Sequence, residues 1–465
     1  MSSPDNTNTA ADTATDTGAD APVAKALNLD AYHERLEQLD PYRMNGRVIQ
    51  VIGLVIEANG PEAQIGELCH IHVSRHADPV AAEVVGFREG STLLMPVGEM
   101  RGIAPGNEVV ATGHPLRVGV GTGLLGRVVN GAGEPIDGRG PIELEEWRSL
   151  HADPPSPMTR RRIDEQLELG VRAMDGLIPC GKGQRLGVFA GSGVGKSSLM
   201  GMIARNTTAD INVIALVGER GREVREFIER DLGEEGMRRS VVVVASSNES
   251  AVMRIDAAFA ATTIAEWFRD RGQNVMLMMD SVTRFAMAQR EIGLAIGEPP
   301  ATRGYTPSVF ALLPRLLERA GTAEVGSITG LYTVLVEGDD MNEPISDAVR
   351  GILDGHVVLS RELAHRNHYP AIDVLQSVSR LTTELFSPDQ LKAAGRVRET
   401  LANWADKEDL VTIGAYAIGT DPTVDYAIAK KPEIDMFLRQ PVDESAKLTE
   451  TLEDLERLVS DHMGF

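Results

Sequence analysis

Cysteine is nearly absent from this chain of 465 residues, which contains only Cys69 and Cys180. Neither belongs to a Cys-x-x-Cys motif, so the sequence offers neither a disulfide framework nor a zinc site. We interpret both as ordinary semi-buried thiols, which pack like small apolar side chains. The chemistry of this protein is therefore expected from other residue types.

Long hydrophobic runs are also absent. No apolar stretch approaches the roughly 18 residues needed to cross a bilayer, and the N-terminus lacks the basic-then-apolar pattern of a secretory signal. We therefore expect a cytoplasmic protein. Its 42% hydrophobic and 25% charged residues are typical of a globular chain with two or three domains.

Aromatic residues and positive charge are scarce. Phe, Trp and Tyr make up 4% of the chain, and 46 basic residues stand against 68 acidic ones, which gives a formal net charge of −22. Single-stranded nucleic acids are bound by basic grooves with aromatic stacking platforms. The composition therefore predicts no specific nucleic-acid partner, and it opposes direct attraction to an anionic membrane.

Two segments of different composition precede residue 46. Residues 1–24 are rich in Asp, Thr, Ala and Asn without periodic apolar positions, which predicts a disordered acidic tail. Residues 25–45 include the amphipathic segment 27–36, which predicts an N-terminal helix. The pattern leaves open whether this helix packs on the protein or binds a partner.

Three folded parts are predicted after the N-terminal helix. From 46 to 113, short β-rich runs alternate with turns such as Asn59-Gly60-Pro61, which predicts a small β-barrel. From 114 to 382, strand-like runs such as Val213–Val217 alternate with helical stretches, which predicts a mostly parallel α/β core. Residues 383–465 have a helical pattern. The predicted fold class is thus α/β, with an N-terminal barrel and a C-terminal helical domain.

The most informative stretch is a glycine-rich loop between a predicted strand and a predicted helix. Small residues let successive backbone N–H groups wrap a triphosphate, Lys196 reaches the outer phosphates, and the Ser197 hydroxyl holds Mg²⁺. Ala190 replaces the usual first glycine of this motif but leaves the glycine cradle intact. The predicted nucleotide-binding residues of the loop are Gly191, Ser192, Gly193, Val194, Gly195, Lys196, Ser197 and Ser198.

Acidic residues follow two other apolar strands. Asp280 ends the run Met276–Met279, an arrangement that places a carboxylate beside the Mg²⁺ held by Ser197. Glu219 and Glu223 follow another strand, at the sheet edge where ligands of open α/β sheets bind. We expect one of them to polarise the attacking water, although the local sequence alone favours a surface ion pair for Glu219.

Arg380 ends a further strand-like run, Gln376–Ser379. An arginine at this position could reach the γ-phosphate of a nucleotide that is bound by a neighbouring subunit. Its planar guanidinium would neutralise the negative charge on the equatorial phosphate oxygens as bonds break. Taken alone, Arg380 fits a structural ion pair better than a catalytic role. Its combination with the glycine-rich loop and the acids favours the catalytic role.

Together these motifs resemble the rotary ATPase superfamily, and specifically its type III protein export branch. The resemblance is carried by Asp280–Gly293, Gly297–Pro300, Arg303–Phe310 and Val336–Pro344. It extends from about Gly46 to the C-terminal helices. It implies a phosphate-loop (RecA-like) core that hydrolyses ATP, with Mg²⁺, in support of protein secretion.

The resemblance assigns roles to the motif residues. Lys196 and Ser197 match the phosphate lysine and the Mg²⁺ ligand, and Glu219 matches the glutamate that orients water. Asp280 and Glu223 match acids near the metal, which are expected to act through water.

Four further residues take their roles from the same resemblance. Arg220 and Arg284 match arginines that couple the site to its surroundings. Arg380 matches the finger supplied in trans by an adjacent subunit, and Tyr369 matches the aromatic that packs on adenine. The expected catalytic set is Lys196, Glu219, Arg220 and Arg380.

The resemblance also implies an assembly. Its members form homohexamers with a crown of β-barrels, bind nucleotide at subunit interfaces, and work with a stator-like regulator, a central stalk protein, export chaperones and a membrane export gate. Such a protein is cytoplasmic and peripheral at the inner face of the cell membrane through its partners. The acidic tail departs from the family pattern, which leaves regulator binding through residues 27–36 open.

The sequence leaves three alternatives to this interpretation. The stretch Asn342–Gly355 is closer to flagellar members than to the ATPases of virulence injectisomes, which remain the alternative. A non-hydrolysing nucleotide-binding subunit is disfavoured because Glu219 is present. A hexameric RNA translocase shares the phosphate loop, but the acidic, aromatic-poor composition disfavours it.

Overall fold

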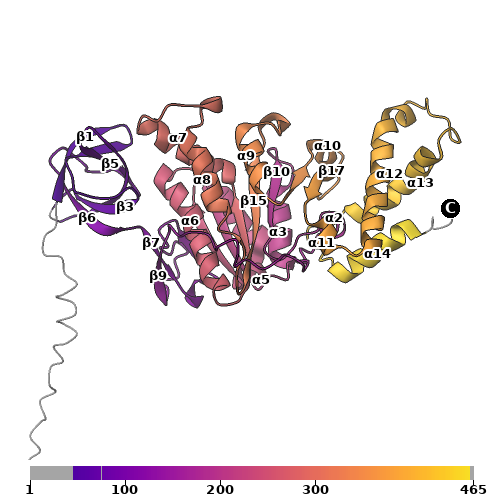
Figure 1. Ribbon diagram of the computed structural model, residues 1–465, viewed down its shortest axis with the longest axis horizontal. Coiled ribbons are helices and arrows are strands. Elements are labelled where there is room, and N and C mark those ends of the chain that lie inside the picture. Colours follow the sequence, from indigo (N-terminus) through magenta and orange to yellow (C-terminus); the bar gives the residue numbers. More distant parts are fainter. Residues whose placement is uncertain (1–44, 75, 461–465) are drawn as a thin grey trace, which may run out of the picture. The chain divides into compact units, whose positions relative to one another are not determined.

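The computed structural model describes residues 45–74 and 76–460 (Figure 1). The predicted acidic tail and the predicted helix at 27–36 lie outside the described residues. The described residues form a barrel, a large sheet flanked by helices, and a C-terminal helical part, which confirms the predicted fold class. None of the described helices combines the length and the apolar character that a membrane span requires.

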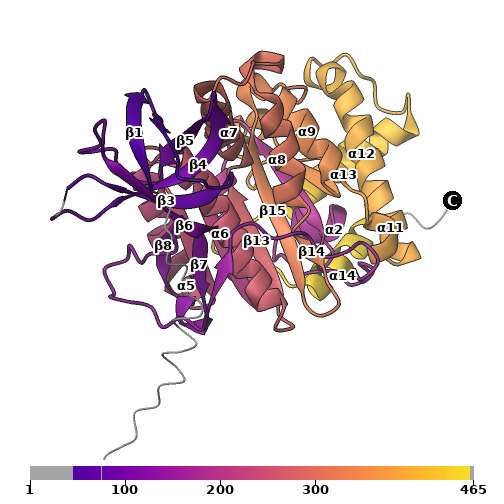
Figure 2. The same ribbon diagram turned by 60° about the vertical axis from the view of Figure 1, so that its left-hand side comes forward.

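The barrel is closed by six antiparallel strands in the order β1-β2-β5-β4-β3-β6 (Figure 2). Alternate side chains point inward, as the pleat of a strand requires, and Ile56, Ile71, Val84 and Leu94 meet in the barrel core. The strands are β1 (Asn45–Ile52), β2 (Val55–Ala58), β3 (Glu67–His72), β4 (Val80–Arg88), β5 (Ser91–Pro96) and β6 (Glu108–Pro115).

The central sheet runs in the order β17-β16-β10-β15-β13-β11-β12-β8, with the short β14 beside β15. All neighbours from β16 to β8 are parallel, whereas β17 is antiparallel to β16. Every residue of β11 and β12 is buried, because helices cover both faces of the sheet. The strands are β8 (Val128–Asn130), β10 (Arg185–Ala190), β11 (Ile211–Val217), β12 (Ser240–Ala245), β13 (Asn274–Asp280), β14 (Gly321–Thr322), β15 (Ser327–Leu335), β16 (Gly355–Leu359) and β17 (Ile372–Ser379). A separate ribbon pairs β7 (Arg117–Val120) with β9 (Glu146–Ser149).

Two hydrophobic cores lie against the sheet, one for each set of flanking helices. The first is formed with α6 (Ala251–Arg269), α7 (Val282–Ala295), α8 (Pro307–Leu317) and α9 (Pro344–Ile352). The second is formed with α2 (Arg172–Leu177), α3 (Lys196–Asn206), α4 (Gly221–Glu226), the π-helical segment η2 (Phe227–Leu232) and the C-terminal helices. The remaining short helical segments are η1 (Thr122–Leu124), α5 (Gly233–Arg238), η3 (Thr302–Gly304), η4 (Glu337–Asp339), α10 (Arg361–His365) and α11 (Thr382–Leu385).

The C-terminal helical part consists of α12 (Pro388–Thr412), α13 (Pro422–Leu438) and α14 (Leu448–Ser460). Helix α12 begins with a capping box: the Ser387 hydroxyl accepts from the Gln390 N–H, and the Gln390 side chain accepts from the Ser387 N–H. This reciprocal pair satisfies two donors that the helix end would otherwise leave unpaired. Leu455 of α14 is fully buried and joins these helices to the second core.

Candidate active site

The glycine-rich loop connects the carboxyl end of β10 to the start of α3. Gly193 and Gly195 have φ angles of 78° and 92°, a left-handed region that residues with a Cβ rarely adopt. Gly195 is also the N-cap residue of α3, where no side chain accepts a hydrogen bond from the first turn. The first N–H groups of α3 are therefore free of side-chain partners and suited to an anion such as phosphate.

Lys196 brings together two of the predicted acids. Its Nζ lies 2.5 Å from Asp280 Oδ1 and 3.7 Å from Glu219 Oε1. Asp280 ends β13 and Glu219 follows β11, so parallel neighbouring strands deliver both carboxylates to one sheet edge. We call Lys196, Glu219 and Asp280 the phosphate-loop cluster. It has one positive charge against two carboxyl groups.

The acidic neighbours change the protonation of Glu219. Burial first, and then the Asp280 carboxylate, raises the pKa of Glu219 to about 7. A hydrogen bond from the Glu219 carboxyl to Glu223 holds the pKa of Glu223 below its ordinary value. Glu223, on α4, also accepts from the Arg220 guanidinium at 2.8 Å. At neutral pH the cluster thus retains a proton on Glu219 for part of the time.

A neutral donor completes the surroundings of Asp280. The Thr333 hydroxyl, on the neighbouring strand β15, donates to Asp280 Oδ1 at 2.7 Å and is fully buried. Sequence reasoning did not identify Thr333, because nothing in its local sequence distinguishes it from other buried threonines of an apolar strand.

The acids do not form a direct metal cage. Within residues 45–74 and 76–460, no group of three or more His, Cys, Asp or Glu side chains is arranged to hold a metal ion. Ser197 lies in the first turn of α3, next to Lys196, while Asp280 is engaged by Lys196 and Glu223 by Arg220.

Tyr369 and Arg380 lie at opposite ends of the edge strand β17. The Tyr369 ring is near the phosphate loop, since its Cε1 and Cδ1 atoms are 3.4 and 3.5 Å from where a Cβ on Gly195 would stand. Arg380 follows the far end of the antiparallel strand β17, where its N–H donates to the Asp354 carbonyl beside the start of β10. The exposed Arg380 therefore does not approach the phosphate loop of its own chain.

Arg284 is close to the Glu219 loop. Its side-chain carbons lie 2.9–3.3 Å from where a Cβ on Gly218 would stand, so the glycine before Glu219 makes room for this arginine. The Arg284 Nε is buried without a hydrogen-bond partner. A donor in this state is available to a group that enters the site.

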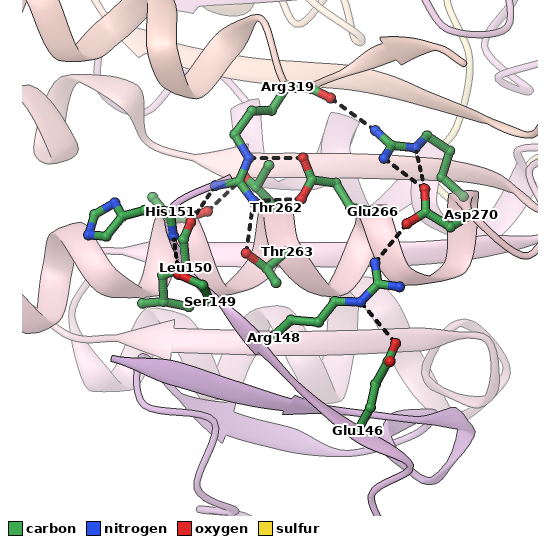
Figure 3. Close-up of polar contacts among 12 residues, drawn as sticks. Glu146, Arg148, Ser149, Leu150, His151, Thr262, Thr263, Glu266, Asp270 and Arg319 are labelled. Carbon is green, nitrogen blue, oxygen red and sulfur yellow. Dashed lines mark hydrogen bonds and ion pairs between the residues drawn. The ribbon is translucent and has the colours of Figure 1, made fainter. Parts of the chain in front are cut away.

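A second cluster of buried charges lies away from the phosphate loop, where the end of α6 meets the segment between α8 and β14 (Figure 3). Arg319, which is 1% exposed, donates to both carboxylate oxygens of Glu266 at 2.9 and 2.6 Å, to the Thr263 hydroxyl at 2.9 Å and to the Leu150 carbonyl at 2.5 Å. We call these four residues the Arg319 cluster. It was not predicted, because Glu266 and Arg319 are 53 residues apart and show no motif.

The chain matches three protein-family models in sequence order. Residues 48–113 match the β-barrel domain of the ATP synthase alpha/beta family, and residues 170–379 match the nucleotide-binding domain of that family. Residues 386–457 match the C-terminal domain of the type III secretion ATPase EscN. Together the matches span the barrel, the sheet and the C-terminal helices.

Individual relatives cover nearly the same length. The chain is 57% identical over 430 residues to the flagellum-specific ATP synthase of Bacillus subtilis. The aligned residues cover 91% of this chain and 97% of the relative. It is 52% identical over 419 residues to the type 3 secretion system ATPase of Xanthomonas euvesicatoria, covering 90% and 95%.

A solved structure agrees with this relationship. Assembled EscN of enteropathogenic E. coli, in complex with its central stalk EscO, superposes with a TM-score of 0.82 at 45% identity and covers 89% of this chain and 100% of its own. The chain therefore belongs to the ATP synthase alpha/beta family and, within it, to the flagellar and type III secretion ATPases.

Proposed function

We propose that this ATPase hydrolyses Mg²⁺–ATP to assist flagellar type III protein export. The observation that carries the proposal is the meeting of Lys196, Glu219 and Asp280 at the start of α3. The export role follows the branch of the family, and the flagellar system is favoured by the higher identity to the Bacillus subtilis relative. An injectisome ATPase is the alternative, since the Xanthomonas euvesicatoria relative is only slightly more distant.

The residues at the loop fit a nucleotide with its metal. A triphosphate supplies the anionic charge that Lys196 and the uncapped start of α3 lack, and it would draw Lys196 away from Asp280. The Ser197 hydroxyl would hold Mg²⁺ directly, whereas Asp280 and Glu223 would hold it through water. When bound, Mg²⁺ neutralises charge on the phosphate oxygens.

Glu219 would orient the attacking water. Glu219 follows β11, the strand that pairs with the Asp280 strand β13. Its carboxyl oxygen lies 3.7 Å from the Lys196 ammonium. A carboxylate accepts a hydrogen bond from water and directs the water oxygen toward phosphorus, so the ionised form of Glu219 is the active one. Arg220 follows Glu219 in the chain, and Arg284 lies beside Gly218. These two arginines would hold the Glu219 loop in place and bind the departing phosphate.

Arg380 is proposed to act on a neighbouring subunit. Strand β10 has six residues and rises about 3.3 Å per residue, so its two ends are roughly 17 Å apart. Arg380 lies at the amino end of β10 and Lys196 lies beyond its carboxyl end. An arginine so placed cannot complete its own site, but in a ring it can complete the next one.

The assembly and its location are part of the proposal. We propose a homohexamer with a central stalk protein, as the complex of EscN with EscO suggests, and with a stator-like regulator, export chaperones and a membrane export gate as further partners. The protein would be cytoplasmic and held at the inner face of the membrane by these partners. We also propose the domain division 46–113, 114–382 and 383–465, preceded by the segments 1–24 and 25–45.

A mixing experiment tests the trans-acting arginine. Rings made only of Lys196→Ala or only of Arg380→Ala subunits should be inactive or nearly so. If Arg380 is an arginine finger, Arg380→Ala should lower kcat by a factor of about 10³ to 10⁵. In mixed rings, Arg380 of a Lys196→Ala subunit can serve the intact loop of an Arg380→Ala neighbour, so a fraction of the activity should return. Mixed rings without activity would contradict action in trans.

The flagellar role is tested in the source organism. A chromosomal Lys196→Ala replacement should abolish swimming and the release of flagellar filament protein, while the altered protein stays at its normal level. Normal flagella in such a strain would contradict the flagellar assignment and indicate an injectisome.

A further inference from the structure

The backbone of Tyr369 is held by the segment that joins α13 to α14. We call residues 439–444 of this segment the α13–α14 connection. The Gln440 N–H donates to the Tyr369 carbonyl at 2.9 Å, while the Tyr369 ring lies beside Gly195 of the phosphate loop. Tyr369 thus contacts the loop with its ring and the C-terminal helical part with its backbone.

Gln440 is itself fixed by its side chain. It is 2% exposed, and its Oε1 accepts from the Arg172 N–H at 2.9 Å. Its Nε2 donates to the Gly170 carbonyl at 2.8 Å and to the Glu444 carbonyl at 3.0 Å. Moving this amide would leave several buried polar groups unpaired, which is costly.

The rest of the α13–α14 connection is anchored on both sides of Gln440. Arg172, at the start of α2, donates from Nη2 to the Arg439 carbonyl at 2.6 Å and from Nε to the Phe437 carbonyl, at the end of α13, at 2.9 Å. On the other side, the Val442 carbonyl accepts from Arg205 at 2.6 Å. Because Arg205 lies in the last turn of α3, the connection contacts the same helix that begins at the phosphate loop.

A weaker contact reaches the residue before Tyr369. His368 is 4% exposed, and its Nδ1 lies 3.9 Å from Asp435 of α13. Lys431 holds the Asp435 carboxylate at 2.6 and 2.7 Å, and the His368 Nε2 is buried without a partner. This incompletely paired histidine holds its segment less firmly than Gln440 does.

We propose that Gln440 is a positioning residue for the nucleotide base, through which the C-terminal helical part sets the place of Tyr369. The proposal rests on the proposed function, in which Tyr369 packs on adenine. Gln440 has no hydrogen bond to Lys196, Glu219 or Asp280 in the described structure. Its influence should therefore be confined to ligands that carry a base.

The test compares ATP with inorganic tripolyphosphate, which has phosphates but no base. In full-length Gln440→Ala, ATP affinity should fall about tenfold, within the roughly 5- to 150-fold range of a lost base-stacking contact, while tripolyphosphate affinity stays unchanged. KM for ATP should rise with kcat unchanged. Gln390→Ala, which removes an amide of the α12 capping box, is the matched control and should change neither ligand.

Two further variants separate the possible outcomes. If Tyr369→Ala weakens ATP but Gln440→Ala does not, the positioning role is overturned and the base contact stands. If Tyr369→Ala has no effect on ATP, the base contact of the proposed function fails, and the inference fails with it. Equal losses for ATP and tripolyphosphate in Gln440→Ala would show a general structural role and overturn the proposal.

A substitution of the same size covers the case in which Gln440→Ala does not fold. Gln440→Glu keeps the length of the side chain and the acceptor for the Arg172 N–H, but it replaces the donor to the Gly170 and Glu444 carbonyls by a second acceptor. Because an acceptor that faces these buried carbonyls is unfavourable, it should shift the ratio of ATP to tripolyphosphate affinity in the same direction by at least as large a factor. In the double variant Tyr369→Ala/Gln440→Glu, no loss beyond that of Tyr369→Ala is expected, and additive losses would contradict coupling through Tyr369.

Discussion

Two buried charge clusters in this protein are built on opposite principles. In the Arg319 cluster, one guanidinium meets one carboxylate through two hydrogen bonds, and a hydroxyl and a carbonyl accept from its other N–H groups. In the phosphate-loop cluster, one ammonium faces two carboxyl groups, and burial raises the pKa of Glu219 to about 7. The first cluster is complete within the chain, whereas the second is not.

The difference indicates which cluster is structural and which is functional. A buried ion pair with all its hydrogen bonds satisfied has nothing left to offer a ligand, and breaking it leaves a buried charge. A cluster with excess negative charge and a retained proton is less stable by itself, and such perturbed groups gather at functional sites. Removing a charge from each cluster in turn tests this contrast.

The largest effect is expected for Glu219→Gln in the phosphate-loop cluster. The amide keeps the size of the side chain but cannot act as the anionic acceptor that orients water, so kcat should fall about 10²- to 10⁴-fold. Folding stability should be unchanged or higher, because a carboxyl group that is costly to ionise has been removed. Steady-state ATPase kinetics and urea unfolding measure the two quantities.

A matched control exists on the adjoining helical segment. Glu229 is exposed and forms a surface ion pair with Arg225, so Glu229→Gln should alter neither activity nor stability appreciably. If Glu219→Gln kept near-wild-type activity, Glu219 would have no role in catalysis. Both clusters would then contribute to structure only.

The opposite outcome is expected for Arg319→Met. The substitution leaves Glu266 buried without its cation and should lower the free energy of unfolding by about 3–5 kcal/mol. ATPase activity per folded molecule should stay the same. The double variant Arg319→Met/Glu266→Leu should recover most of the loss, because no buried charge then remains unpaired. Urea unfolding of the single and double variants measures this, and a double variant as unstable as the single one would contradict the explanation.

A smaller effect is expected in the pH dependence of stability. Because the pKa of Glu219 is about 7 in the folded protein against an ordinary 4.5, the folded state binds more protons between these values. The free energy of unfolding should therefore fall as the pH rises from 4.5 to 7. The lowered pKa of Glu223 acts in the opposite direction, but mainly below pH 4.5, so it leaves the fall between pH 4.5 and 7 nearly unchanged.

The measurement is urea unfolding of nucleotide-free, Mg²⁺-free protein across this pH range. The stability of the wild type minus that of Glu219→Gln should decrease from pH 4.5 to 7 and be level above pH 7. A flat difference across the whole range would show that Glu219 is fully ionised in the folded state, and the contrast between the clusters would lose its electrostatic basis.

The fold was predictable where local pattern decides it. The buried runs of β11 and β13, the glycine-rich loop before α3 and the capping box at Ser387 each carry a signal within a few residues, and the structure confirms these elements. The π-helical segment η2 was not predicted, because no composition rule distinguishes its six residues from an α-helix.

The site was predictable only in part for the same reason. Glu219 and Asp280 stand at the ends of apolar strands, a pattern that is visible in the sequence. Thr333 and Gln440 act through partners 53 and 71 residues away, and only the register of the sheet and the docking of the C-terminal helices bring these pairs together. Long-range contacts of this kind leave no trace in a single sequence.

The smallest effect is expected for Thr333→Val, which removes the neutral donor of the phosphate-loop cluster while keeping the shape of the side chain. The Asp280 carboxylate keeps Lys196 as a partner, so it is not left unpaired, and the loss of folding stability should be about 1 kcal/mol. The same hydroxyl holds Asp280 toward β15, so KM for Mg²⁺–ATP should rise modestly. A loss as large as that of Arg319→Met would mean that the phosphate-loop cluster depends on complete pairing as much as the Arg319 cluster does. Urea unfolding of both variants side by side decides this, because both remove a hydrogen-bond donor from a buried carboxylate and only one removes its sole cation.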